Sequence, residues 1–349
     1  MSRRRVIRPG RCPGLMPASV PRFGTFSIVA ADLARGEWGV AVQSRFIAVG
    51  AMVPWAAAGV GAIATQAYAN VRYGPEGLAL LRAGRSASEV VEQLTRADPE
   101  RDHRQLGVVD ARGRAAAYTG RACLEYAGQV VGEGFTCQGN ILFGAPVVAA
   151  MARSFQSTPG DLPERLLAAL DAGQREGGDR RGMQSAAMLI VREAGGYDAG
   201  SDRWVDLRVD DHPSPIEELR RLFELYDVTL LTREDPATLV RLEGEALRAM
   251  ERDLGVLGYL IGAARPTFDE KVRAAFSKFL NENNFENKAR SDGTAWPSVL
   301  RALSERAERE LDRRRTTAPT VPGALDRGPG AAGTGGSSST EPTKRNAPR

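Results

Sequence analysis

The sequence predicts an α+β fold of antiparallel sheets covered by helices, followed by a small all-α domain of three helices. Two observations carry this prediction. Apolar, β-branched segments come in pairs joined by short turns, a pattern typical of hairpins. Helical segments also come in pairs instead of one after each strand, which argues against a doubly wound parallel sheet. Beyond residue 236 the apolar residues keep helical spacing, which predicts the separate helical domain.

The elements follow in chain order from these patterns. TFSIVAA, the turn DLARGE and WGVAVQSR predict a first hairpin from residue 25 to 45, and VGAIATQ predicts a third strand at 60–66. Two helices follow, and Ser86 with Glu89 forms a capping box that begins the second. The remaining predicted elements are a hairpin at 105–120, one strand in 129–140 that ends in a polar, Gly-containing loop, helices at 145–157 and 161–174, strands at 186–193 and 203–209, and a helix at 215–226.

Changes in composition divide the chain into domains. Residues 1–24 hold six arginines and no acid among prolines and glycines, which predicts a disordered basic extension. Residues 25–226 form the α+β domain, 227–311 the helical domain, and 312–349 a disordered tail rich in Pro, Gly, Ser and Thr. The first arginines precede no apolar stretch typical of an export signal, so we expect a cytoplasmic protein. Met16 is an alternative start.

The basic residues are unevenly distributed. Only four of the 47 are lysines, and residues 1–270 contain none. Residues 1–24 have a net charge of +6 and 312–349 of +4, so the net +4 of the chain leaves −6 for 25–311. This distribution argues against nucleic acid as a partner. No apolar run approaches the length of a membrane helix, so no membrane partner is expected either.

Cysteine and histidine are scarce. The three cysteines form no CxxC pair, and there are only two histidines. These counts argue against a disulfide framework, a histidine-based catalytic triad and a zinc site. We therefore expect no metal and no cofactor.

The first candidate for chemistry is Thr25, at the start of the first strand. A threonine that becomes the first residue carries a hydroxyl and a free α-amine, and the amine can accept the hydroxyl proton without a histidine. Freeing Thr25 requires cleavage after Gly24, where the missing Cβ permits the strained turn that self-cleavage needs. The alternative is that Thr25 is an ordinary strand residue.

Other candidates lie at the ends of neighbouring strands. Ser44 ends the second strand as a candidate substrate-binding residue. Arg45 after it is the predicted cation near Thr25, where it would hold the amine neutral or bind a substrate carboxylate. Gly139 and Asn140 lie between a predicted strand and helix and could supply backbone N–H groups as an oxyanion hole. The alternatives are a surface arginine and an ordinary turn.

Polar residues at two further strand ends complete the candidate site. Asp179, Gln184 and Ser185 enter an apolar strand, where they could orient the amine of the nucleophile. Gln66 and Asn70 follow the third strand and suit hydrogen bonding to a substrate. The alternative for all five is a hydrophilic loop or a turn.

Several sequence blocks in residues 25–226 carry a family resemblance. They include TFSIVA, GVAVQSRFIAVGAMVPWA, ATQAYANVRYGPEGL, GEGFTCQGNIL and GGDRRGMQSAAMLIVRE. On these blocks the region resembles the bacterial family known as domain of unknown function 1028, which looks like a branch of the N-terminal-nucleophile (Ntn) hydrolases. The resemblance implies a four-layer αββα sandwich.

The resemblance also implies hydrolysis of an amide bond by an N-terminal Thr, Ser or Cys. Thr25 matches the residue that family members show just after their initiator methionine, and Gly24 precedes it as in proteasome-type precursors that cut themselves. Gln43, Ser44 and Arg45 resemble the proteasome-type Asp-Ser-Arg block, with Gln43 in place of the aspartate. The catalytic lysine of proteasome-type enzymes has no counterpart, because this part of the chain has no lysine.

Two looser correspondences and an assembly follow from the same resemblance. Gly139 and Asn140 resemble the oxyanion loop, and residues 179–182 resemble an Asp-containing turn before a strand. The implied substrate is a small amide or a peptide-like molecule. The implied assembly is a homo-oligomer.

Residues 236–305 resemble a peptidoglycan-binding domain that often follows domains of this family along the chain. The motifs are LEGEALRAMERDLGVLGYLIG, FDEKVRAAFSKFLNENNFENK and WPSVLRAL. The resemblance implies peptidoglycan fragments as ligands, whereas a helical domain can equally serve dimerisation. Two alternatives to an enzyme therefore stay open: a catalytically inactive Ntn-like scaffold that binds wall fragments, and an oligomeric interaction module without a ligand.

Overall fold

The computed structural model describes residues 24–262 and 267–317. They divide into two compact units. The first contains the described chain through Val240 together with Leu280–Val299, and the second contains Arg241–Phe279 and the described residues from Leu300 on. Except for Gly24 and residues 312–317, the expected N-terminal extension and C-terminal tail lie outside the described residues.

The first unit is built on two antiparallel sheets, which confirms the prediction from paired segments. The larger sheet has the strand order β10-β9-β2-β1-β8-β7. Its strands are β1 (Thr25–Asp32), β2 (Glu37–Ser44), β7 (Gly128–Gly132), β8 (Phe135–Asn140), β9 (Ser185–Val191) and β10 (Arg203–Val209). The single strand predicted at 129–140 is instead the hairpin β7–β8, because Gly134 reverses the chain with a φ of 76°.

The smaller sheet has the order β3-β4-β5-β6. Its strands are β3 (Pro54–Ala57), β4 (Gly61–Ala67), β5 (Arg104–Asp110) and β6 (Ala115–Thr119). Strand β3 is not predicted by the sequence pattern. Its four residues begin with a proline and show no alternation, and the strand lies at the edge of the sheet, where a proline is tolerated.

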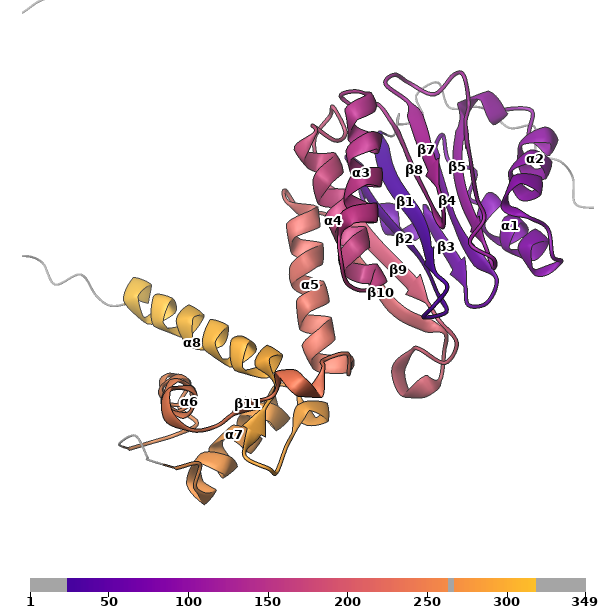
Figure 1. Ribbon diagram of the computed structural model, residues 1–349. Helices are drawn as coiled ribbons and strands as arrows, with labels where there is room; N and C mark the ends of the chain where they lie inside the picture. The colour runs from indigo at the N-terminus through magenta and orange to yellow at the C-terminus, as the bar shows by residue number, and fades with distance from the viewer. Residues whose placement is uncertain (1–23, 263–266, 318–349) are drawn as a thin grey trace, which may run out of the picture. The chain divides into compact units, whose positions relative to one another are not determined.

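Helices cover the outer faces of both sheets (Figure 1). Helices α1 (Tyr73–Arg82), α2 (Ala87–Ala97), α3 (Ala145–Ser157), α4 (Leu162–Arg175) and α5 (Pro215–Leu230) lie wholly within the described part of this unit. The capping box at the start of α2 is present as predicted. Helix α5 continues past residue 226 into the predicted linker, since Val228 still packs in a buried position.

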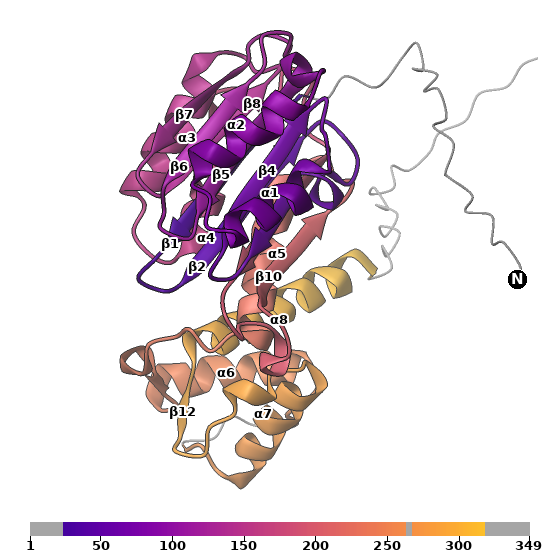
Figure 2. The same cartoon turned by 90° about the vertical axis from the view of Figure 1, so that its right-hand side faces the viewer.

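The layers of this unit run helix, sheet, sheet, helix. Helices α1 and α2 lie across the smaller sheet, and α3 and α4 lie on the far side of the larger one (Figures 1 and 2). Three buried apolar clusters fill the spaces between successive layers, and the middle cluster joins the two sheets through residues such as Val29, Val40 and Ala64. Burial of these apolar faces is the main force that holds the layers together.

A buried polar network shares the space between the sheets. Gln66 of the smaller sheet accepts a hydrogen bond from Ser27 Oγ at 2.6 Å, and Gln138 Nε2 donates to the same hydroxyl at 2.6 Å. Gln66 Nε2 donates to Gln105 Oε1 at 2.8 Å, and Asn140 Nδ2 donates to the same oxygen at 2.9 Å. All five side chains are buried, so their mutual hydrogen bonds replace those that water would have made.

The C-terminal region is mainly helical, as predicted. It contains α6 (Gly244–Val256), α7 (Glu270–Glu282) and α8 (Pro297–Thr317), with the short strands β11 (Val240–Arg241) and β12 (Thr294–Ala295) pairing with each other. Helix α6 begins later than the helical spacing from 236 predicted, because Pro236–Thr238 forms a 3-10 turn before β11. Along the described ranges, no helix has both the length and the apolar character needed to cross a bilayer.

Glu37, at the start of β2, gives the fold a predictable dependence on pH. Its side chain is fully buried, and Arg192 Nη1 lies 3.3 Å from Oε1. Burial raises the pKa of this carboxyl to about 7, although the Arg192 charge opposes the rise. Because the folded state binds the proton more tightly than the unfolded state, stability should fall as pH rises from about 4.5 to about 7. The full effect amounts to about 3 kcal/mol at 1.36 kcal/mol per pH unit.

Glu37→Gln should flatten this dependence, because the amide cannot ionise. Urea unfolding of both proteins at pH 5 and pH 8 measures the effect. Glu76→Gln is the control, since the Glu76 side chain is half exposed. An equal loss of stability between pH 5 and pH 8 in wild type and Glu37→Gln would contradict the assignment.

Candidate functional site

Two hydroxyl groups meet at the end of the larger sheet where β1 begins. Thr25 of β1 is paired in register with Ser44 of β2. Thr25 Oγ1 donates a hydrogen bond to Ser44 Oγ at 3.1 Å, and Ser44 Oγ donates to the carbonyl oxygen of Gly24 at 2.5 Å. Both side chains are buried. The hydroxyls thus form a relay from Thr25 to the peptide bond that precedes it.

Arg181 is a second donor to the same carbonyl. Its Nη2 lies 2.8 Å from the Gly24 oxygen. The guanidinium also binds both oxygens of Asp179, with Nε 3.0 Å from Oδ1 and Nη2 2.7 Å from Oδ2. The Asp179 side chain is fully buried, whereas that of Arg181 is 30% exposed. A carbonyl oxygen that gains negative charge here would face a fixed cation and a hydroxyl donor.

Arg45, the cation expected near Thr25, makes its described side-chain hydrogen bond with another group. Its guanidinium donates to the carbonyl of Met183 at 3.1 Å. Its backbone N–H, instead, donates to Asp179 Oδ2 at 3.0 Å. The sequence places Arg181 in the turn at residues 179–182, but its pattern does not predict a role for this side chain. The signal that points to it is an arginine two residues after an aspartate in a turn that enters a strand.

Ser185 and Gln184 shape loops at this end of the sheet. Ser185 Oγ donates to the carbonyl of Phe46 and accepts from the N–H of Val49 at 3.1 Å, so it fixes the loop after β2. The Gln184 side chain donates to Asp211 at 3.0 Å. Neither side chain makes its described hydrogen bonds with Thr25, and both therefore act on the architecture around the site.

Gly139 and Asn140 lie beside Thr25 but within strand β8, not in a loop. Asn140 is in register with Thr25, and Gly139 is in register with Phe26. The Gly139 carbonyl accepts from Gln105 Nε2 at 2.8 Å, and the Asn140 side chain belongs to the buried network. Helix α3 begins only at residue 145, so no helix N-terminus adjoins these two residues as the oxyanion prediction assumed.

Gln66 and Asn70 have separate positions. Gln66 Nε2 lies 3.4 Å from the carbonyl oxygen of Thr25, which couples the buried network to the start of β1. Asn70 Nδ2 donates to Asp98 at 3.1 Å, in a cluster where Arg104 Nε also binds Asp98 at 2.9 Å. Several hydrogen bonds, from Arg104 foremost, hold the pKa of Asp98 at about 2 against the effect of burial. Asn70 thus stabilises a loop.

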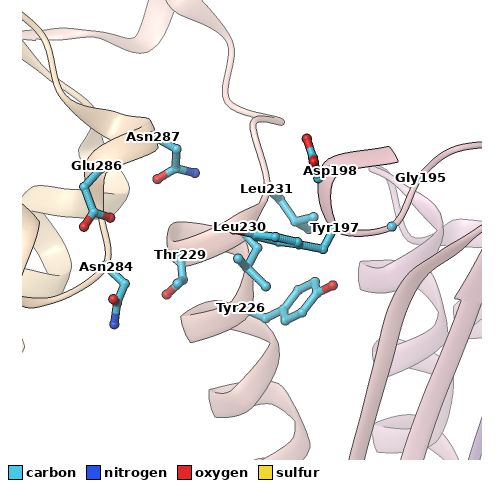
Figure 3. A pocket seen from close by; sticks show the side chains of 11 residues that line it. Gly195, Tyr197, Asp198, Tyr226, Thr229, Leu230, Leu231, Asn284, Glu286 and Asn287 are labelled. Atoms are coloured by element: carbon cyan, nitrogen blue, oxygen red, sulfur yellow. The ribbon is translucent and has the colours of Figure 1, made fainter. Parts of the chain in front are cut away.

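Two hollows lie at opposite ends of β9. A cavity of about 20 Å³, room for about one water molecule, adjoins Thr25 and is lined mainly by apolar side chains. A larger hollow of about 680 Å³ lies beyond the other end of β9, where Tyr197 and Tyr226 face it together with Asn284 and Asn287 (Figure 3). Across residues 24–262 and 267–317, no three His, Cys, Asp or Glu side chains gather as a metal site would require.

Comparisons with known proteins divide the chain in two. Residues 25–219 match a family model described as "Family of unknown function (DUF1028)". Residues 229–303 match one described as "Putative peptidoglycan binding domain". The crystal structure of protein SPO2555 from Silicibacter pomeroyi, assigned to the first of these families, is 32% identical; the match covers 60% of this chain and 96% of that chain, with a TM-score of 0.54. The curated proteins contain no match to the chain.

Proposed function

The chain belongs to the family of unknown function DUF1028, and from the groups around its first strand we propose that it is an Ntn-type amide hydrolase. Its nucleophile is the hydroxyl of Thr25, which cleavage after Gly24 converts into an N-terminal residue. The observation that carries this proposal is the relay from Thr25 through Ser44 to the Gly24 carbonyl, with Arg181 at the same oxygen. Its substrate is a small amide or a peptide-like molecule.

The relay has the connectivity that self-cleavage needs. Thr25 Oγ1 attacks the carbonyl carbon of Gly24, its proton passes to Ser44 Oγ, and the Ser44 proton passes to the carbonyl oxygen. Collapse then passes the proton of this oxygen to the Thr25 nitrogen as the carbonyl re-forms and the C–N bond breaks, so that Gly24 is held as an ester on Thr25 and the amine of Thr25 is free. Water hydrolyses the ester and releases residues 1–24 with a new carboxyl terminus. Arg181 stabilises the charge that develops on the oxygen.

The same groups serve hydrolysis of a substrate after release. The free amine of Thr25 accepts the hydroxyl proton as general base. The substrate carbonyl takes the place of the Gly24 carbonyl, between Ser44 and Arg181. The helix–sheet–sheet–helix order of the first unit also supports an Ntn-like assignment, because the resemblance implied these four layers.

Intact-mass spectrometry and N-terminal sequencing of the full-length chain test the proposal. Wild-type protein should lose residues 1–24 and begin at Thr25, whereas Thr25→Ala should stay intact, because it has no hydroxyl to attack the peptide bond. Thr25→Ser should still be cleaved. A wild-type chain that begins at Met1 or Met16 under every condition would contradict the proposal.

Peptidoglycan fragments are the second partner that we propose, on the match at residues 229–303. Co-sedimentation of the full chain with purified peptidoglycan measures this binding. It also separates the alternatives: a chain that stays intact, hydrolyses no amide and still sediments with peptidoglycan would be an inactive binding scaffold.

A further inference from the structure

The space around the Gly24 α-carbon has no room for a side chain. A Cβ atom built on Gly24 would lie 2.6 Å from Asp179 Oδ1 and 2.7 Å from Oδ2. Favourable contacts between non-bonded atoms lie near 3.5–4.0 Å, so this position is blocked unless the carboxylate moves. Asp179 therefore closes off one side of the carbon that precedes the reacting carbonyl.

The Asp179 carboxylate cannot easily move away. Oδ1 accepts from the backbone N–H of Arg181 and from its Nε, both at 3.0 Å. Oδ2 accepts from the backbone N–H of Arg45 at 3.0 Å and from Arg181 Nη2 at 2.7 Å. The side chain is also fully buried. A rotation that admitted a methyl group would break charge-assisted hydrogen bonds inside the protein, where their loss is costly.

This restriction carries over from the precursor to the substrate if the proposed function holds. Self-cleavage places the acyl group of Gly24 as an ester on Thr25 Oγ1, and substrate hydrolysis passes through an ester on the same atom. The α-carbon of the substrate acyl group then lies where the α-carbon of Gly24 lay, against Asp179. An acyl group with a CH₂ next to its carbonyl fits this space, and one with a side chain there in the L configuration does not.

We propose that Asp179 limits the substrates to amides whose acyl group has no L-configured substituent on the carbon next to the reacting carbonyl. Glycyl amides, β-alanyl amides and amides of a side-chain carboxyl group such as γ-glutamyl belong to this class. L-α-Aminoacyl amides with a side chain, such as L-alanyl, L-valyl and L-leucyl amides, are excluded. The proposal rests on the proposed function and adds to it the class of acyl group.

Two experiments with the full-length chain test this limit. The chain, after release of residues 1–24, is assayed with p-nitroanilides of glycine, β-alanine, γ-glutamate, L-alanine and L-leucine. The kcat/KM values of the glycine, β-alanine and γ-glutamate anilides should exceed those of the L-alanine and L-leucine anilides by about 10–200-fold, the discrimination that a steric misfit provides. Gly24→Ala should slow release of the extension by a similar factor while keeping the far-UV circular dichroism of wild type.

The results distinguish failure of the acyl-group limit from failure of the proposed function. Hydrolysis of alanyl and glycyl anilides at equal rates, abolished by Thr25→Ala, overturns the acyl limit and leaves the hydrolase. Cleavage of Gly24→Ala at the wild-type rate also overturns the limit. An intact chain that hydrolyses none of the five anilides overturns both, because no acyl ester then forms on Thr25.

Discussion

Arg181→Ala slows the release of residues 1–24 by about 10²–10³-fold, the loss typical of removing one donor from a developing oxyanion. The guanidinium lies 2.8 Å from the Gly24 oxygen and is partly shielded from water, so its charge acts at short range. Arg181→Lys should recover only part of the rate, because an ammonium cannot bind Asp179 and the carbonyl in the same forked geometry. The time course of cleavage by intact mass measures both variants.

Arg45→Ala is the matched control for this experiment. Its guanidinium donates to Met183, and the backbone N–H that binds Asp179 is retained in the variant. Cleavage should therefore stay within a few-fold of wild type. A large loss in Arg45→Ala with little loss in Arg181→Ala would reverse the assignment of the cation. Melting curves of all variants show whether a slow rate reflects unfolding.

Ser44→Ala should slow the same cleavage by about 10²–10³-fold, through loss of both the relay and one donor to the carbonyl oxygen. The hydroxyl accepts from Thr25 and donates to Gly24, and alanine does neither. Ser44→Thr keeps a hydroxyl and should retain part of the rate. Single-turnover cleavage of freshly refolded chain gives the rate constants.

Ser154→Ala controls for the loss of a serine hydroxyl elsewhere. Ser154 lies on α3 and donates to the carbonyl of Ala168 at 3.0 Å, remote in sequence from the β1–β2 hairpin. The Ser154→Ala chain should release residues 1–24 at the wild-type rate. If Ser44→Ala also cleaves at that rate, the proton of Thr25 travels by another route and the relay is not used.

Most of the fold could be predicted because its apolar patterns are strong. Strands β1, β2 and β9 have long buried runs, helices α3 and α4 bury one face at helical spacing, and the structure places all of them where the patterns indicated. The elements that the sequence pattern does not predict are short or depend on pairing with another strand. Strand β3 is four residues long and gains its form from pairing with β4. Tertiary pairing of that kind leaves little signal in local sequence.

The sequence predicted which strand ends form the candidate site, but it did not predict the directions in which their side chains point. The hairpin register fixes Thr25 beside Ser44, so their meeting followed from the sequence. Which arginine reaches the Gly24 carbonyl depends on how the loop before β9 folds back, through the bridge between Leu142 and Asp179. The spacing of residues along the sequence does not indicate that contact. It therefore could not distinguish Arg45 from Arg181.

The amide network between the sheets limits how the two sheets can slide past each other. Apolar side chains tolerate small displacements, because dispersion contacts have little directionality, whereas an amide donor needs its acceptor within a few tenths of an ångström. Moving one sheet along the other would break the hydrogen bonds that cross between them, from Ser27 to Gln66 and from Asn140 to Gln105, and would leave these buried groups without those partners. Apolar side chains in place of this network would permit the two sheets to pack in several alignments. The chain thus holds β1, and the reactive hydroxyl at its end, in a single position by accepting polar groups in its interior.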